Sequence, residues 1–197
     1  MRRTQQERSD ATRAALITAA RDLFGARGYH DVPAEEITRT AGVTRGALYH
    51  HFGDKKGLFR AVVEVLEREL TNEVDAVLGD AANPLSGLAT ALGVFLDACL
   101  REEVRRISLT DAPAVLGWEE WRQIEAAYGL GLVTENLAKA RDSGLIADTP
   151  VETLAQLVLS TVMEAARMIA VADDPDRVRA DVQQVFAGWL SGLLRPA

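Results

Sequence analysis

The sequence predicts an all-α protein, with an N-terminal three-helix helix-turn-helix domain followed by a larger helical domain. Two observations predict the helical class. Alanine and leucine dominate the 197 residues, and both favour helices. No alternating run of β-branched residues bounded by turn residues indicates a strand. A third observation, the change of charge along the chain, predicts the division into two domains.

Capping residues followed by proline indicate where helices begin. The pairs at 83–84 and 174–175 join Asn or Asp to a proline in the first helical position. Thr149 stands three residues before Glu152, which is the spacing of a capping box. Glycines mark several helix ends. The expected helices cover residues 9–27, 33–41, 44–51, 55–79, 84–105, 113–142 (with a break inside), 150–172 and 175–194.

Charge is distributed unevenly along the chain. The whole chain has a net charge of −7 and a pI near 5.0, yet residues 1–60 hold 11 Lys and Arg against 7 Asp and Glu. All three histidines also lie in this basic part. Such asymmetry predicts that one end of the chain meets a polyanion. We therefore expect a DNA-binding domain over residues 1–54 and a regulatory and dimerisation domain over residues 55–197, with helix 55–79 shared between them.

Residues 33–53 have the pattern of a helix-turn-helix. Apolar residues lie one turn apart on both expected helices, Ile37 and Ala41 on the first, Leu48 and Phe52 on the second. These groups can close on each other across the turn at 41–43 only if the two helices cross steeply. A corner of this kind can place its second helix in the major groove of DNA.

The outward side of this second helix carries groups that can reach base edges or phosphate oxygens. They are Thr44, Arg45, Gly46, Tyr49 and His50. At the start of the next helix, Lys55 and Lys56 add ammonium charges to free backbone N–H groups, a combination that attracts phosphate.

Each of these features also has a plainer interpretation. A helix-turn-helix pattern alone is often an ordinary helical corner, Arg45 can be a solvated surface charge, and Tyr49 can pack within the small domain. His50 and His51 are adjacent and point about 100° apart on a helix, so we expect no metal site there. The arginines at 2, 3, 8 and 13 fit either a solvated tail or an arm that attracts phosphate or reaches a minor groove.

Residues 44–59, TRGALYHHFGDKKGLF, resemble the recognition segment of the TetR family of transcriptional regulators, and residues 20–29, ARDLFGARGY, resemble the end of that family's first helix. The resemblance covers about residues 10–65. It implies a homodimer that binds a palindromic operator, usually represses, and releases DNA when a small ligand fills the larger domain. By position, it implies base or near-base contacts from Thr44 and Arg45. It further implies phosphate contacts from Tyr49, His51 and Lys55.

The sequence departs from the family pattern just before the recognition segment. Val32 and Pro33 replace the usual Ser or Thr cap, and Thr38 replaces a small alanine. Glu35 and Glu36 place acid on a helix that often helps to bind DNA. We therefore expect specificity to rest on residues 44–50.

The larger domain offers candidates for a small-molecule pocket. Trp118 and Trp121 are three residues apart and share a helix face, and aromatic side chains beside an arginine suit a mostly apolar ligand. The candidate pocket residues are Phe95, Cys99, Arg106, Trp118, Trp121 and Tyr128. The same aromatic stripe also fits an ordinary core, and Cys99 fits inert packing as well as a redox sensor.

The last two expected helices carry apolar stripes with small residues, which suit a four-helix dimer interface. The candidate interface residues are Leu157, Thr161, Ala165, Val182, Phe186 and Trp189. The alternative is that these helices only cover their own domain. Because the reading of two operator half-sites requires a dimer, the interface is the favoured interpretation.

These features together predict a ligand-responsive transcriptional regulator, most simply a repressor. A small, largely apolar effector would tilt helix 55–79 and change the separation of the two recognition helices. The alternative is a DNA-binding regulator whose larger domain binds another protein and has no small ligand.

Other classes are not expected. No histidine follows residue 51, the adjacent glutamates at 102–103 and 119–120 diverge on a helix, and no phosphate loop occurs, so no enzyme is predicted. No cofactor or metal is expected, and Cys99 as the only cysteine cannot form an internal disulfide. No apolar run approaches the roughly 20 residues of a membrane span and no secretory signal is seen, which predicts a cytoplasmic protein without a membrane partner.

Overall fold

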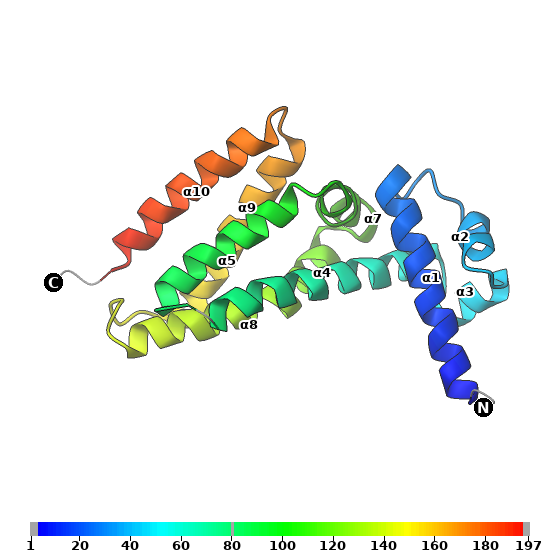
Figure 1. Cartoon of the computed structure of the whole chain (residues 1–197), viewed down its shortest axis with the longest axis horizontal. Helices are drawn as coiled ribbons and strands as arrows, with labels where there is room; N and C mark the ends of the chain where they lie inside the picture. The colour runs from blue at the N-terminus through cyan, green and yellow to red at the C-terminus, as the bar shows by residue number, and fades with distance from the viewer. Residues whose placement is uncertain (1–3, 80, 195–197) are drawn as a thin grey trace. The chain divides into compact units, whose positions relative to one another are not determined.

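The computed structural model describes residues 4–79 and 81–194, and it confirms the all-α class (Figure 1). Within these ranges the only β-type pairing is an isolated bridge between Ile146 and Leu194. The elements are α1 Gln5–Arg27, α2 Ala34–Thr40, α3 Arg45–Phe52, α4 Lys55–Gly79, α5 Pro84–Cys99, α6 Glu102–Val104, the π-helix η1 Arg105–Asp111, α7 Ala112–Leu116, α8 Trp118–Asp142, α9 Val151–Val171 and α10 Pro175–Gly192.

Side-chain caps stand at the starts of α1, α3, α5 and α10. Asn83 forms a capping box with Ser86 at the start of α5, and the side chain of Asp174 accepts from the N–H of Arg177 at the start of α10. The capping box expected at Thr149 is wrong, because Pro150 occupies the N-cap position of α9 without a side-chain cap. A capping box at Thr4, which the sequence analysis did not single out, begins α1 earlier than expected.

The largest departure from the expected helices lies between residues 99 and 118. The helix expected over 84–105 ends at Cys99, and the chain continues through α6, η1 and α7 before α8 begins. Pro113 has no N–H to donate, and this favours a change in the backbone hydrogen-bond pattern of the residues before it. The hydroxyl of Thr110 donates to the carbonyl of Arg105, five residues earlier, at 2.8 Å. Gly117, with φ of 94°, supplies the break expected inside 113–142.

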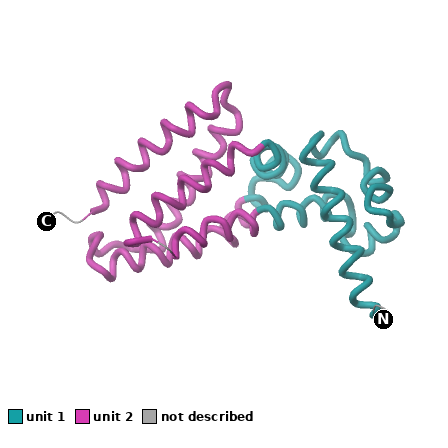
Figure 2. Tube along the Cα trace, viewed as in Figure 1, with its two compact units in different colours: residues 1–66, 102–121 teal, residues 67–101, 122–197 magenta. Residues whose placement is uncertain are grey.

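The chain divides into two compact units (Figure 2). Unit 1 comprises residues 1–66 and 102–121, and unit 2 comprises residues 67–101 and 122–197. This differs from the boundary expected at residue 54. The helix-turn-helix needs the first part of α4 for its core, since the rings of Phe24 and Phe59 pack edge to face with centroids 5.3 Å apart. Segment 102–121 joins unit 1 through α1, where Arg21 bonds Glu103 at 2.6 and 3.0 Å.

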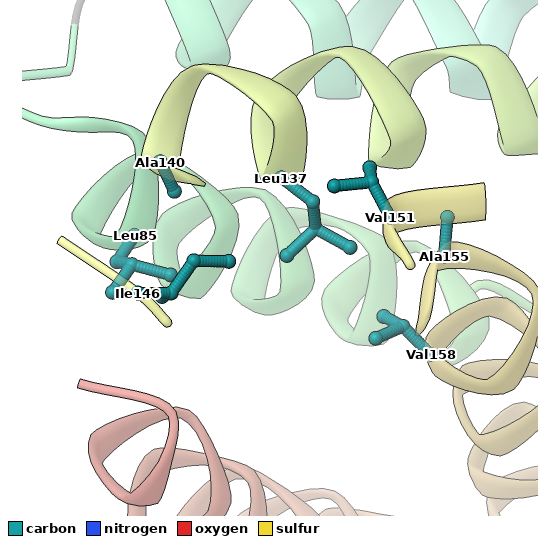
Figure 3. Packing of buried hydrophobic residues seen from close by; sticks show 7 residues of the cluster. All are labelled: Leu85, Leu137, Ala140, Ile146, Val151, Ala155 and Val158. Atoms are coloured by element: carbon teal, nitrogen blue, oxygen red, sulfur yellow. The ribbon is translucent and has the colours of Figure 1, made fainter. Parts of the chain in front are cut away.

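Unit 2 is built around α5, α9 and α10, which pack on one another. One part of its core is a cluster from α5, α8, α9 and the turn before α9 (Figure 3): Leu85, Leu137, Ala140, Ile146, Val151, Ala155 and Val158. By length and composition alone α9 resembles a membrane span. The core helix of a soluble protein passes the same test, and α9 buries eight side chains inside unit 2.

Candidate nucleic-acid interface and ligand cavity

The α2–α3 corner of unit 1 has the geometry of a helix-turn-helix. Ile37 of α2 and Leu48 of α3 are both fully buried. Gly42 turns the chain with φ of 66°, a conformation that favours glycine, and the N–H of Val43 donates to the carbonyl of Thr38 at 3.0 Å. The apolar faces therefore point inward, and the opposite face of α3 is left at the surface.

The N-terminus of α3 is open to a partner. Thr44 caps it, because its Oγ1 accepts from the N–H of Ala47 at 3.3 Å. A Cβ added at Gly46 would meet nothing closer than Thr44 Oγ1 at 3.8 Å. Packing within the chain therefore does not require glycine here, and the exposed backbone allows close approach of another molecule.

Arg45 lies on this exposed face between two partners. Its Nη1 is 2.7 Å from Oε1 of Glu35 on α2, and its Nη2 donates to the hydroxyl of Tyr49 at 3.0 Å. Both groups raise the pKa of Arg45, the Tyr49 hydrogen bond most of all. Tyr49 itself is 43% exposed. The guanidinium is thus held at the surface between the Glu35 carboxylate and the partly exposed Tyr49 phenol.

Lys55 is less available than the sequence indicates. Its Nζ donates to the carbonyls of Tyr29 and Val32 at 2.9 and 3.0 Å and lies 3.9 Å from the centroid of the Tyr29 ring. Desolvation lowers its pKa. Of the three N–H donors of an ammonium group, two are therefore occupied by backbone carbonyls within unit 1.

The remaining basic residues near α3 are placed as follows. His50 is exposed and His51 is half-buried, with ring centroids 5.1 Å apart. Within residues 4–79 and 81–194, no group of three potential metal ligands occurs. Arg13 on α1 lies over the ring of Phe52 at 5.5 Å, and Arg8 is also on α1. Arg2 and Arg3 lie outside the described residues.

Unit 2 contains a cavity of about 110 Å³. Apolar side chains from α4, α5, α8, α9 and α10 form most of its wall, including Leu70, Leu92, Phe95, Met163 and Phe186. A cavity of this composition suits a mostly apolar small molecule.

Of the six candidate pocket residues, Phe95 lines this cavity and the other five do not. Arg106, Trp118 and Trp121 belong to unit 1, because they lie in segment 102–121, whose α6 and η1 pack against α1. Trp121 is buried there, and its indole N–H donates to the carbonyl of Ser108 at 3.1 Å. Tyr128 is half-buried on α8.

Cys99 is fully buried in unit 2. Burial raises the pKa of its thiol, and the nearby Glu67 carboxylate raises it further. A thiol that stays protonated and has no solvent access is unreactive, so the geometry matches inert packing rather than a redox sensor.

Three polar residues in the cavity wall were missed by the sequence analysis: Glu67, Thr71 and Glu125. The signal was present in the spacing of α4, where Glu67 and Thr71 continue the four-residue spacing of the inward-facing Val63. Glu125 is only 4% exposed. Burial raises its pKa to about 8, and the charge of Glu67 acts in the same direction.

The helices α9 and α10 expose apolar side chains. Leu157, Met168 and Val171 on α9 and Val185 on α10 are 58%, 45%, 70% and 70% exposed. Leu157, Thr161, Met168 and Val171 fall on one stripe of α9.

Of the six candidate interface residues, Leu157 and Thr161 lie on this exposed stripe. Ala165, Val182 and Phe186 are buried within unit 2, and Trp189 is half-buried against Phe186. For the buried members, the helical stripe faces the core of the same chain, as in the alternative in which these helices cover their own domain.

A helix-turn-helix with an exposed recognition helix, in a chain whose second unit holds an apolar cavity, defines the class of DNA-binding transcriptional regulators. Residues 16–62 match the family described as "Bacterial regulatory proteins, tetR family". Residues 85–193 match "Tetracyclin repressor-like, C-terminal domain". The chain belongs to the TetR family, whose members are transcriptional regulators and not enzymes.

Relatives cover most of the chain. It is 31% identical to the transposon Tn10 TetC protein of Escherichia coli over 72% of this chain and 76% of the relative. It is 31% identical to the HTH-type transcriptional repressor BepR of Brucella suis over 82% and 81%. Among solved structures, a TetR-family transcriptional regulator from Pectobacterium atrosepticum matches with a TM-score of 0.87 and 34% identity, over 99% of this chain and 100% of that one.

Proposed function

We propose that the protein is a cytoplasmic, ligand-responsive repressor that binds a palindromic operator as a homodimer and releases it when a small molecule fills the cavity of unit 2. The observation that carries the DNA-binding part is the exposed N-terminus of α3. Arg45 and Tyr49 stand at the surface there, and the backbone at Gly46 is open. A guanidinium can contact guanine in bidentate fashion, and we assign this contact to Arg45. We assign contacts with neighbouring bases or phosphates to Thr44 and Tyr49.

His50, His51 and Lys55 complete the proposed DNA surface. His50 is exposed beside Tyr49 and extends the base-reading face, whereas His51 is half-buried and reaches a phosphate. Lys55 has two N–H groups bonded to carbonyls, and we assign its third N–H to a phosphate.

The homodimer is supported by the exposed apolar stripe of α9 together with Val185 of α10. A second copy of the chain that packs these stripes against its own removes their apolar area from water. Two recognition helices then read two half-sites about 34–36 Å apart.

The effector is supported by the apolar cavity of unit 2. One structurally similar protein is SmeT in complex with triclosan. It is 25% identical to this chain, with a TM-score of 0.72 over 95% of this chain and 93% of that one. We assign the cavity the same kind of role in this chain. Because α4 runs from unit 1 into unit 2, a ligand in the cavity changes the position of α4 and thereby weakens operator binding. By reciprocity, the operator weakens ligand binding by the same factor.

DNase footprinting of the full chain on DNA from upstream of its own gene tests this function. We expect one protected site with two-fold symmetric half-sites, and loss of protection when a cavity-filling compound is added. Protection without any sequence preference, or an asymmetric site occupied by one chain, contradicts the proposal.

A further inference from the structure

The π-helix η1 contacts the end of α1 through two side chains that lie five residues apart. Arg106 donates to the carbonyl of Ala26, and Oδ2 of Asp111 accepts from the N–H of Tyr29 at 2.7 Å. In an α-helix, side chains five residues apart point about 140° apart. A π-helix bonds residue i to residue i+5, so the same two side chains share one face. The π geometry of η1 therefore turns both Arg106 and Asp111 toward α1.

Asp111 lies directly against the backbone that follows α1. Gly28 ends this helix with φ of 82°, and a Cβ added there would stand 3.3 Å from Oδ2 of Asp111. The ring of Tyr29 packs against the rings of Phe24 and Phe59, with centroids 5.6 and 4.9 Å away. Tyr29 is therefore fixed at its ring by the core of unit 1 and at its backbone N–H by a charged acceptor, which forms stronger hydrogen bonds than a neutral one.

Lys55, at the start of α4, is held by the same loop. Its Nζ donates to the carbonyls of Tyr29 and Val32 at 2.9 and 3.0 Å and lies 3.9 Å from the centroid of the Tyr29 ring. An ammonium group has three N–H donors, and fixing two of them also fixes the direction of the third. A mobile lysine loses rotamer freedom when a ligand orders it, whereas Lys55 is ordered before any ligand arrives.

We propose that Asp111 is a positioning residue for DNA binding: it holds the backbone of Tyr29, and through it the ammonium group of Lys55, in the place from which Lys55 binds a phosphate. This rests on the proposed function, in which Lys55 is assigned to a phosphate. The charge of Asp111 itself repels DNA. Loss of that charge alone therefore strengthens DNA binding, whereas loss of the hydrogen bond to Tyr29 weakens it.

Two variants of Asp111 separate the hydrogen bond from the charge. Asp111→Asn and Asp111→Ala both remove the charge, but only asparagine keeps an oxygen that accepts from the N–H of Tyr29. We expect Asp111→Ala to bind DNA at least about fivefold more weakly than Asp111→Asn, because each chain of the dimer must then order Lys55 on binding. Asp111→Asn should stay within about twofold of the wild type. Equal affinity of the two variants overturns the proposal.

The same pair of variants in the Lys55→Gln chain shows whether Asp111 acts through Lys55. Glutamine has no ammonium group to position, so the difference between Asp111→Ala and Asp111→Asn should fall to within about twofold. In the matched control Lys139→Gln, at an exposed lysine of α8, the difference should persist. An undiminished difference in the Lys55→Gln chain would show that Asp111 only stabilises unit 1, and it overturns the proposal.

Binding is measured both on the operator and on a random-sequence duplex of equal length. Phosphate contacts carry no sequence information, so Asp111→Ala should weaken binding to both duplexes by the same factor relative to Asp111→Asn. A larger loss on the operator would indicate a displaced recognition helix and overturns the proposal. If the wild type prefers no sequence, the repressor function fails, while the random duplex still decides the role of Asp111. If the wild type binds neither duplex at low salt, both fail.

A measurement on the wild-type chain remains decisive if Asp111→Ala does not fold. Because the hydrogen bond to Asp111 favours DNA binding, DNA must favour the hydrogen bond by the same factor. Hydrogen exchange of the Tyr29 amide should therefore slow by at least about twofold per chain when DNA is bound. The amide of Leu145, which donates to the carbonyl of Ala140 in unit 2, should keep its rate. Unchanged exchange at Tyr29, or equal slowing at both amides, overturns the proposal.

Discussion

Arg45 of the recognition helix α3 is ion-paired with Glu35 of α2, with Nη1 and Oε1 2.7 Å apart. Both side chains are largely exposed, so the pair contributes little to stability. The pair matters because the guanidinium that we assign to DNA binding is already bound to a carboxylate of the neighbouring helix. DNA must therefore compete with Glu35 for Arg45, and Glu35 also repels nearby phosphates.

The substitution Glu35→Gln should strengthen DNA binding. It removes the competing carboxylate and one negative charge, so we expect about threefold or tighter binding to operator and to random DNA alike. Filter binding at one fixed salt concentration measures the change, and Glu135→Gln, the same charge change in unit 2, should leave affinity unaltered. Weaker operator binding by Glu35→Gln would show that Glu35 positions Arg45 rather than competing for it.

The exposed stripe of α9 and α10 should hold two chains together. Leu157→Glu and Val185→Glu each place a charge where the proposed interface buries apolar side chains. We expect sedimentation equilibrium to show a shift from dimer to monomer, with operator affinity reduced at least about tenfold. Ala127→Glu, at an exposed position of α8, is the matched control. Variants that remain dimeric would place the interface elsewhere.

Asp111 connects the π-helix η1 to the end of α1 by a hydrogen bond. Its Oδ2 accepts from the N–H of Tyr29 at 2.7 Å, and Arg106 of η1 donates to the carbonyl of Ala26. Asp111→Ala leaves the Tyr29 N–H without its charged acceptor, which we expect to lower the free energy of unfolding by about 1–3 kcal/mol. Urea denaturation measures this. The control Asp148→Ala, at an exposed acid, should change the free energy of unfolding by less than about 0.5 kcal/mol. An equally small effect of Asp111→Ala would contradict a stabilising role for its hydrogen bond.

Glu125 should make stability depend on pH in a direction opposite to that of most acids. Burial raises its pKa from the ordinary value of 4.5 to about 8 on folding, so the folded chain binds the proton more tightly. The unfolding free energy therefore decreases as pH rises from about 4.5 through about 8.

The substitution Glu125→Gln removes this dependence. Above a pH of about 8 we expect the variant to be more stable than the wild type by on the order of 1–3 kcal/mol, with a much smaller difference near pH 5. Thermal denaturation at the two pH values measures it, with Glu135→Gln as control. If the wild type were as stable as Glu125→Gln at high pH, the result would show that the carboxyl of Glu125 ionises in the folded chain without the expected rise in its pKa.

The helix-turn-helix was predictable because its signals are local. The turn at Gly42 and the one-turn spacing of Ile37 with Ala41 and of Leu48 with Phe52 all lie within 16 residues of one another. These contacts close over short stretches of chain, so the pattern in the sequence fixes which faces meet.

The cavity was less predictable because five helices far apart in sequence converge on it. Trp118 and Trp121 look like pocket residues by spacing, but they lie in segment 102–121, which belongs to unit 1 through its contacts with α1. Glu67 and Glu125 are the opposite case, because they were not expected in the pocket and do line the cavity. The four-residue spacing of α4 places Glu67 on the same face as Val63. Acidic residues are ordinarily solvated, however, so this spacing alone did not indicate burial.

The most direct test of the central claim is the fluorescence anisotropy of operator DNA with the wild-type chain, Arg45→Ala and Arg141→Ala at two salt concentrations. Loss of a bidentate base contact costs about 1–3 kcal/mol, or roughly ten- to a hundredfold in affinity. We expect the wild-type chain to bind with nanomolar affinity and sequence selectivity, and its affinity to fall steeply with salt. Arg45→Ala should lose affinity by the factor just given. Arg141→Ala, whose arginine lies on α8, should bind like the wild type. Equal affinity of all three proteins, or binding without sequence preference, would contradict the account.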